Sequence, residues 1–304
     1  KEVAYLKEQK VDGMIMDLRN NGGGSLQTVV DMVGLFIPQG PVVQIKAKSG
    51  EKEVLYDRDK TTQWEGPLVV LINNYSASAS EIFAAAIQDY NRGLVLGSKH
   101  SYGKGTVQNL IDLNRFGDKK IGDLGGVKFT TQKFYRVNGG STQLKGVESD
   151  IVLPDRLLYI DTGERDNKTA LVWDKIPQAS YTLFTNNFAP IIEKSKSRIA
   201  ANKEFKLIDE SAQWVKAQQD DVKYPLNYAA FMEKTKEAEA KSKKFTELKD
   251  YKNNLAFKTL PHDEEIIKKD TVLQNKRKRW YKSLNNDVYV NEAVNVLKDI
   301  KSIK

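Results

Sequence analysis

The sequence predicts an α/β domain over residues 1–160, followed by an all-helical region over residues 161–304. The glycines give the first indication, because 19 of the 20 lie in residues 1–160 and only Gly163 lies beyond them. Glycine marks turns and close backbone approaches, so this distribution favours strands and loops in the first half. Apolar runs also alternate there with helical patterns, which is typical of helices covering a sheet.

Hydrophobic spacing predicts the elements of the first half in chain order. Residues 11–18 form a short apolar run that ends in glycines, which is typical of a buried strand. Helical spacing at residues 26–36 predicts a helix that stops before Pro38. Two further runs, at residues 42–48 and 53–56, predict a pair of strands.

The alternation continues through the rest of the first half. Residues 67–72 predict a second buried strand, the alanine-rich segment 80–90 predicts a helix, and residues 94–96 predict another strand. Alternating runs at residues 106–113 and 127–137 add two more strands, and an Asn-Gly-Gly turn closes the second of them. Strands and helices thus succeed one another as expected for an α/β core.

The second half predicts helices with solvated lysines. The helical stretches are residues 190–202, 204–220, 227–250 and 264–281, with a terminal helix from Asn291. We place the boundary between the two halves in the polar stretch 161–168. The net charge of +8 lies mostly in the second half, including a basic run at residues 276–280. No nucleic-acid motif accompanies that run, so we expect no nucleic-acid partner.

The composition excludes several kinds of chemistry. The chain has no cysteine, which excludes disulfides, cysteine nucleophiles and thiolate metal sites. It has two histidines, His100 and His262, so a histidine-rich metal site is excluded and a catalytic base other than histidine is expected. No apolar run approaches the roughly 18 residues of a membrane-spanning helix, so we expect no transmembrane segment.

Three segments of the first half could carry chemistry. The first is the run Asn-Asn-Gly-Gly-Gly-Ser at residues 20–25, between a predicted strand and a predicted helix. Its glycines allow backbone N–H groups to face outward and hold an anion or an oxyanion. A plain turn between strand and helix is the other interpretation.

The second segment contains three alternating serines, at residues 76–80, before a predicted helix. Small residues there leave a hydroxyl exposed at the helix N-terminus, where the helix dipole favours a developing alkoxide. Ser78 and Glu81 also have the spacing of a capping box, so Ser78 is either a nucleophile or a simple N-cap.

The third segment, residues 97–108, resembles a phosphate-binding loop but fails its spacing. Five residues separate the glycines, and Gly105 follows Lys104 where a hydroxyl residue is required. In an extended segment, Lys104 and Gln108 share one face, so Gln108 could support the amine. A lysine acts as a base near neutral pH only where its surroundings lower its pKa from about 10.4 to roughly 7–8.

Residues 11–154 resemble the C-terminal processing peptidases, serine proteases that use a Ser/Lys dyad. The strings that carry the resemblance are DLRNNGGG, SASASEI and GKGTVQ, at residues 17–24, 76–82 and 103–108. A fourth string, FYRVNGGSTQ at residues 134–143, matches the tail-specific branch of the family in particular. The resemblance implies a crotonase-like sheet-and-helix protease core, incomplete at its N-terminus, and the helical half resembles that branch's C-terminal extension.

The resemblance also assigns roles to single residues. It implies that Ser78 is the nucleophile and Lys104 the general base, with oxyanion-hole amides on Gly24 and Ala79 and a lysine-orienting role for Gln108. Acyl transfer by such a dyad requires no metal or organic cofactor.

Asp89 matches an acid that the tail-specific branch treats as catalytic. Eleven residues of helix are about 16 Å long, so Asp89 cannot touch Ser78 if both lie on the predicted helix. We expect an indirect role, in ordering the turn near Arg92 or the lysine loop. A structural salt bridge is the alternative.

The resemblance implies partners and a location as well. The family carries an upstream PDZ domain that binds substrate C-termini, and we expect this chain to be a C-terminal fragment without it. The implied substrates are polypeptides recognised by their C-terminal tails, and the implied location is the bacterial periplasm. A non-catalytic peptide-binding or scaffolding fragment of the same fold is the alternative.

Overall fold

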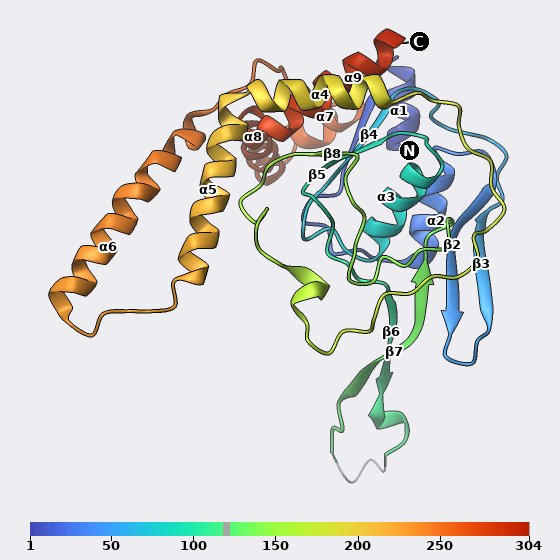
Figure 1. Ribbon diagram of the computed structural model, residues 1–304. Coiled ribbons are helices and arrows are strands. Elements are labelled where there is room, and N and C mark those ends of the chain that lie inside the picture. Colours follow the sequence, from blue (N-terminus) through green and yellow to red (C-terminus); the bar gives the residue numbers. More distant parts are fainter. Residues whose placement is uncertain (118–121, 304) are drawn as a thin grey trace.

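The computed structural model describes residues 1–117 and 122–303 (Figure 1). Two four-stranded sheets with helices form the first half of the chain, and helices dominate the second half. This mixed α/β core followed by a helical region confirms the predicted fold class. A short N-terminal helix, α1 (Glu2–Glu8), was not predicted, and none of its residues is buried.

One sheet is parallel throughout, in the order β1-β4-β5-β8. Its strands are β1 (Met14–Asp17), β4 (Leu68–Ile72), β5 (Leu94–Gly97) and β8 (Ile151–Val152). Every residue of β4 is buried, because helices cover both faces of the sheet. Val70 faces α2 (Leu26–Gly34) and α3 (Ala79–Asp89), whereas Leu71 faces the C-terminal helices. β8, only two residues long, was not predicted.

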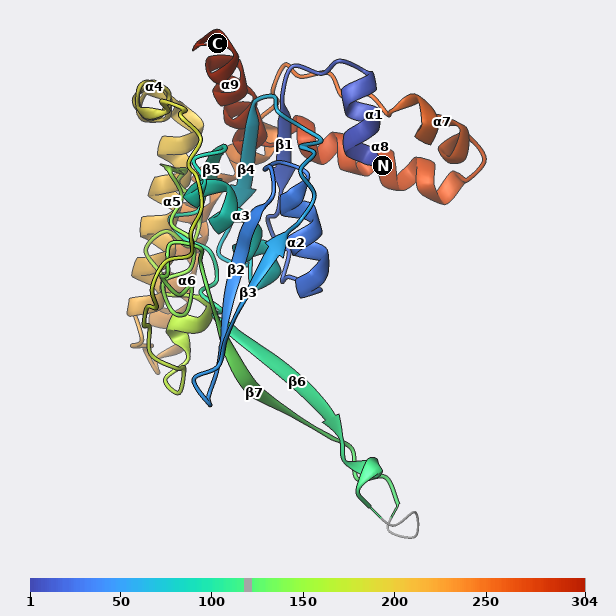
Figure 2. The same cartoon turned by 90° about the vertical axis from the view of Figure 1, so that its right-hand side faces the viewer.

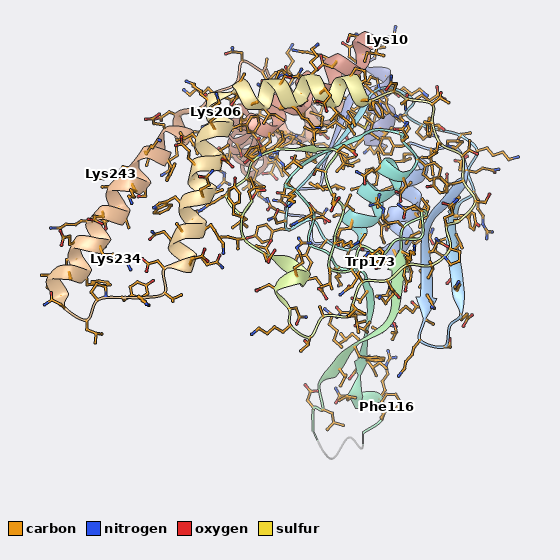
Figure 3. All side chains as sticks on the ribbon, viewed as in Figure 1. Lys10, Phe116, Trp173, Lys206, Lys234 and Lys243 are labelled. Atoms are coloured by element: carbon orange, nitrogen blue, oxygen red, sulfur yellow. The ribbon has the colours of Figure 1, made fainter. Side chains whose placement is uncertain are left out.

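The second sheet is antiparallel, in the order β3-β2-β7-β6. Its strands are β2 (Gly40–Ala47), β3 (Lys52–Asp57), β6 (Thr106–Asp112) and β7 (Gly126–Tyr135). β2 and β3 pair with each other, which confirms the pairing predicted for residues 42–48 and 53–56. The outer parts of β6 and β7 form a hairpin that projects away from the body of the protein (Figure 2). Phe116, near the tip, is 78% exposed (Figure 3).

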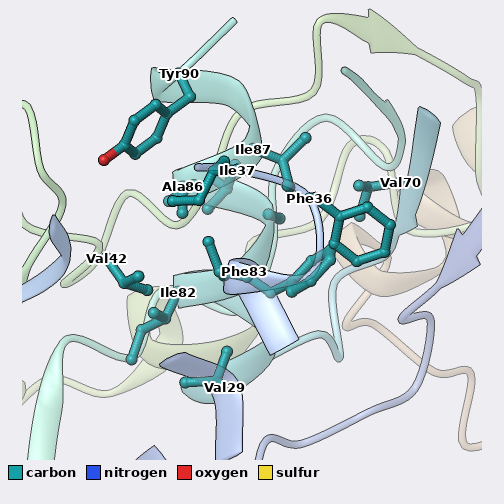
Figure 4. Packing of buried hydrophobic residues seen from close by; sticks show 14 of the residues in the cluster. Val29, Phe36, Ile37, Val42, Val70, Ile82, Phe83, Ala86, Ile87 and Tyr90 are labelled. Carbon is teal, nitrogen blue, oxygen red and sulfur yellow. The ribbon is translucent and has the colours of Figure 1, made fainter. Parts of the chain in front are cut away.

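The core next to the candidate site lies between α2, α3 and the parallel sheet (Figure 4). Phe36 and Phe83 are almost fully buried and meet edge to face, with ring centroids 5.6 Å apart. Three consecutive alanines, residues 84–86, let α3 lie close to the elements around it. The site at the N-terminus of α3 therefore stands on a tightly packed helix.

The C-terminal helices are α4 (Ala189–Ala201), α5 (Lys203–Asp220), α6 (Tyr228–Lys243), α7 (Pro261–Lys268), α8 (Thr271–Asn285) and α9 (Val288–Ile303). The prediction of a single helix at residues 264–281 is wrong, because this stretch is divided between α7 and α8. Asp270 interrupts it by accepting hydrogen bonds from the N–H groups of Val272 and Leu273, which caps a new helix. The stretch predicted as one helix at residues 227–250 is likewise α6 followed by 3₁₀ turns at Lys244–Asp250.

Ion pairs join C-terminal helices to one another, and apolar side chains pack them on the sheet. Arg198 on α4 bonds to both Glu292 and Asp299 on α9, at 2.6 Å in each case. Val296 of α9 and Phe205 of α5 pack on the outer face of the parallel sheet. The helical half is thus the third layer of the core. Within residues 1–117 and 122–303, no helix combines the length and apolarity needed to span a bilayer.

A long irregular segment joins the two halves. Between β8 and α4, its only regular element in the described chain is a 3₁₀ turn at Gly163–Asp166. Figure 1 shows it as the yellow-green line that leaves β8 and passes the base of β6 and β7. It then runs up the right-hand side of the view to α4. The predicted boundary at residues 161–168 falls within this segment and lies against the body of the protein.

Candidate active site

The three alternating serines have different surroundings. The hydroxyl of Ser76 donates to the carbonyl of Leu18 at 2.8 Å, and that of Ser80 donates to the carbonyl of Asn21 at 3.0 Å. Both serines are buried and hold the glycine-rich loop against the start of α3. Ser78 is instead partly exposed, so it is the serine of the three that a polypeptide can reach.

The backbone at Ser78 is strained. Its φ of 56° and ψ of −115° put it in a region that residues with a side chain seldom adopt. It is the N-cap of α3, and the predicted capping box with Glu81 is confirmed. A sharp turn between a buried strand and a helix is the arrangement that presents the nucleophilic serine in the α/β-hydrolases. The N-cap role and the nucleophile role are therefore compatible.

The glycine-rich loop lies directly against Ser78. A Cβ on Gly23 would stand 2.8 Å from the Cβ of Ser78 and 2.9 Å from the nitrogen of Ala79, and φ of Gly23 is +102°. Only glycine allows this approach. The carbonyl of Asn21 accepts a hydrogen bond from Ala77, which fixes the loop to the serine turn.

Two backbone N–H groups at this junction are available to an oxyanion. Ala79 is the first residue of α3, where a helix leaves its N–H groups without intrahelical acceptors. Across residues 1–117 and 122–303, neither Gly24 nor Ala79 donates its N–H to an acceptor. The two residues share the lining of one cavity, beside Ser78. They are the pair expected from the sequence.

That cavity is small and mostly apolar. It has a volume of about 160 Å³ and lies between α2 and α3. Its apolar lining includes Leu18, Val29, Met32 and Phe83. A cavity of this size beside the candidate oxyanion donors suits one apolar side chain of a bound polypeptide.

Lys104 lies just before β6, and its amine bonds to Gln108, the partner expected from the spacing. Nζ of Lys104 donates to Oε1 of Gln108 at 3.3 Å. Thr142 donates its hydroxyl to the carbonyl of Lys104 at 3.0 Å, and Oε1 of Gln143 accepts from the N–H of Gly105 at 2.8 Å. The string at residues 134–143 thus forms a cradle for the backbone around Lys104. This explains in physical terms why the lysine loop and that string occur together.

A buried carboxylate connects Ser78 to the lysine loop. Oε2 of Glu81 accepts the N–H of Ser78 at 2.7 Å and the N–H of Lys104 at 3.0 Å. Its Oε1 accepts the hydroxyl of Ser101 at 2.6 Å and the N–H of Gly103 at 2.7 Å. Because both N–H groups bond to the same oxygen, the distance between the backbone nitrogens of Ser78 and Lys104 cannot exceed the sum of these two distances.

Glu81 was expected only as a capping residue. Its side chain is fully buried, and this burial raises its pKa to about 7, although its four hydrogen bonds oppose the rise. The sequence signal was present, since Glu81 follows Ser78 at capping-box spacing. The bonds to the lysine loop could not be predicted, because they join residues more than 20 positions apart.

Asp89 lies at the other end of α3 from Ser78, as its spacing predicts. It forms a bidentate pair with Arg136, at 2.6 and 3.0 Å, and accepts a hydrogen bond from Asn138. Burial raises the pKa of Asp89, and the charge of Arg136 opposes this. In the described residues no hydrogen bond or ion pair joins Asp89 to Arg92, whose guanidinium donates to carbonyls of other loops. The salt bridge expected as the alternative role of Asp89 is present.

We expect Asp89→Ala to lower the free energy of unfolding by about 3 kcal/mol, because it leaves the mostly buried Arg136 without its partner. The rate of cleavage should fall as well, because Arg136 belongs to the 134–143 segment that holds the backbone around Lys104. Urea denaturation monitored by circular dichroism measures the first effect. Asp59→Ala, at an exposed position, is the control. A wild-type unfolding free energy in Asp89→Ala would contradict this account.

His100 lies in the lysine loop and bonds to Arg165, and burial lowers its pKa. Other charged and concave features share no residue with this site. In the described chain, the carboxylates of Glu2 and Asp263 and the ring of His262 could hold a metal ion, but Glu2 is exposed and we assign none. A larger cavity, of about 570 Å³, lies between Arg19 and the C-terminal helices and shares no lining residue with the serine site.

Comparisons with known proteins identify the family. Residues 1–153 match the model of peptidase family S41. The chain belongs to peptidase family S41. Residues 157–302 match a second model, the C-terminal domain of tail specific protease (DUF3340). The predicted family, with its tail-specific branch, is therefore confirmed.

The relatives of this S41 chain are longer proteins, of which it matches a part. It is 47% identical over 234 residues to the tail-specific protease of Haemophilus influenzae, covering 75% of this chain and 34% of that protein. It is 36% identical over 162 residues to a carboxyl-terminal-processing protease of Synechocystis, covering 52% and 36%. A solved photosystem II D1 C-terminal processing protease is 32% identical, with a TM-score of 0.43, over 49% of this chain and 36% of that one. The chain thus spans about a third of the length of these relatives.

Proposed function

We propose that this chain carries the catalytic dyad of a serine endopeptidase that cleaves polypeptides recognised by their C-terminal tails. The observation that carries the proposal is the shared Oε2 of Glu81, which accepts the N–H groups of both Ser78 and Lys104. This contact joins the backbone of the strained serine to that of the lysine that the motifs single out. Within residues 1–117 and 122–303, the amine of Lys104 bonds to Gln108 and not to the hydroxyl of Ser78. Family membership and the relatives' names support the substrate class.

In the proposed mechanism, Lys104 takes the proton of the Ser78 hydroxyl as Oγ attacks the carbonyl carbon of a peptide bond. The N–H groups of Gly24 and Ala79 stabilise the negative charge on the carbonyl oxygen. The C–N bond then breaks, and Lys104 gives its proton to the leaving amine. Lys104 then deprotonates a water molecule, whose oxygen attacks the carbonyl carbon of the ester. The bond from this carbon to Oγ of Ser78 breaks, and Lys104 returns the proton to Oγ. The scheme needs no metal or organic cofactor.

The surroundings of Ser78 also support a preference at the cleaved bond. The apolar cavity beside Gly24 and Ala79 would take the side chain on the acyl side of that bond. Its volume of about 160 Å³ is enough for one apolar side chain, because an apolar cavity of about this size can take a single benzene ring. A periplasmic location and recruitment of substrates by an upstream PDZ domain remain proposals from the family resemblance.

The test is cleavage of an unfolded polypeptide by the 304-residue chain. We expect wild-type protein and the exposed control Ser49→Ala to cleave it, and Ser78→Ala to leave it intact. The new N-termini, identified by mass spectrometry, should follow apolar residues. Equal cleavage by Ser78→Ala would contradict the proposed nucleophile. A wild-type chain that binds the polypeptide without cleaving it would favour the alternative, a peptide-binding or scaffolding fragment.

A further inference from the structure

The segment between the two halves contacts the lysine loop through residues 163–165. We call residues 157–188 the strap; it begins where the second family region begins. In Figure 1 the strap passes the base of the hairpin, and Figure 3 places its Trp173 there. Trp173 donates its ring N–H to the carbonyl of Ser141 at 2.8 Å, so the strap also touches the cradle around Lys104.

Arg165 makes the most contacts of the strap with this part of the protein. Its guanidinium donates to the carbonyls of Leu144 and Ser101, at 2.5 and 3.0 Å, and lies against Nδ1 of His100. Leu144 in turn donates its N–H to the carbonyl of Gly103 at 2.8 Å. One planar side chain thus joins the lysine loop to the end of the cradle, which suits the forked donors of arginine.

The neighbours of Arg165 hold the strap in register with the loop. The N–H of Glu164 donates to the carbonyl of Tyr102 at 3.0 Å, and its carboxylate accepts from Gln143 at 3.1 Å. Gly163 has a φ of +78°, and a Cβ there would stand 2.4 Å from the carbonyl oxygen of Tyr102. The single glycine of the second half is therefore at the one close approach that requires it.

These contacts hold the chain on both sides of Lys104. The strap binds residues 100–102, which precede Gly103 and Lys104, and it binds Gln143, which accepts the N–H of Gly105 directly after Lys104. Catalysis is sensitive to such placement, since an error of about 1 Å can cost roughly a hundredfold in rate.

We propose that the strap positions the Lys104 loop, and that Arg165 is the positioning residue through which it acts. The helical half then has a part in the chemistry, because its first segment fixes the general base. The consequence for catalysis rests on the dyad proposed above, whereas the effect on the loop does not.

The test measures the loop and the serine separately in the full 304-residue chain. Amide hydrogen exchange reports on the N–H groups of Gly103 and Lys104, and the rate of fluorophosphonate labelling reports on Ser78. The variants are Arg165→Ala and Arg165→Lys. The control is Arg156→Ala, an exposed arginine just before the strap.

In Arg165→Ala we expect faster exchange at these two amides and labelling slowed by roughly 10- to 100-fold. Arg165→Lys should give intermediate values, because an ammonium cannot reach all three acceptors. Millimolar guanidinium should partly restore labelling in Arg165→Ala. Arg156→Ala should behave as wild type.

Two results would overturn the proposal. One is unchanged exchange at Gly103 and Lys104 in Arg165→Ala. The other is faster exchange throughout the parallel sheet, since Arg165 would then support the fold and not the loop. If wild-type protein is not labelled at Ser78, the proposed dyad fails, and the exchange data still decide the role of the strap.

Discussion

Replacing Lys104 by alanine is expected to lower the rate of peptide cleavage by about 10²- to 10⁴-fold, the usual contribution of a general base. The variant loses both the acceptor for the Ser78 proton and the donor to the leaving amine. Its fold should persist, because the loop is held by backbone groups of residues 103–105 and not by the lysine side chain. Initial rates on an unfolded polypeptide, with circular dichroism as a check of folding, measure the effect.

Lys99→Ala is the matched control for this prediction. Lys99 is an exposed lysine of the same loop, and its side chain makes no hydrogen bond or ion pair within residues 1–117 and 122–303. It should retain wild-type activity. Retention of activity by Lys104→Ala, or an equal loss in Lys99→Ala, would contradict the role of Lys104 as the base.

Replacing Glu81 by glutamine is expected to slow labelling of Ser78 by about 10²-fold or more. The carboxylate accepts four hydrogen bonds, two on each oxygen. A glutamine offers one oxygen and an NH₂ group that donates, so two of the four donors lose their acceptor. The serine turn and the lysine loop should then separate. Glu53→Gln, at an exposed position on β3, is the control.

The same residue predicts a pH dependence with opposite signs for activity and stability. The pKa of Glu81 is about 7 in the folded protein, against an ordinary value of 4.5. Between these values the folded state holds a proton that the unfolded state has released, so the contribution of Glu81 to stability falls as pH rises through this window. Labelling of Ser78 should instead rise, because the ionised carboxylate accepts all four bonds.

Labelling rates and urea denaturation from pH 5 to pH 8 measure both effects. Glu81→Gln should lack the rise in labelling that the ionisation of Glu81 causes, and its labelling should stay low throughout. Wild-type labelling rates in Glu81→Gln would show that the carboxylate does not hold the two catalytic segments together.

Local pattern was sufficient for the elements that carry the site. The apolar run at β4, the alanine-rich α3 and the small residues before it predicted where Ser78 would lie. Spacing also predicted the contact between Lys104 and Gln108, because four residues of extended chain return to the same face. The family motifs then separated Ser78 from its two neighbouring serines.

Long-range contacts were beyond the reach of the sequence. The bonds from Glu81 to residues 101–104 and from Arg165 to Ser101 span 20 or more positions, and nothing in their local patterns announces them. The polar stretch at residues 161–168 predicted a boundary between the two halves. Its contacts with the lysine loop were not predicted, because polarity does not reveal which residues a loop contacts. Capping by Asp270 was overlooked for a different reason: the apolar pattern on its two sides continues across the break.

The measurement that tests the central claim most directly is the site of fluorophosphonate attachment, mapped by mass spectrometry in wild-type protein and in Lys104→Ala. The account predicts an adduct on Ser78 in the folded wild-type chain, and its near absence after heat denaturation and in Lys104→Ala. An adduct on Ser76 or Ser80, or equal labelling of Ser78 without Lys104, would contradict it.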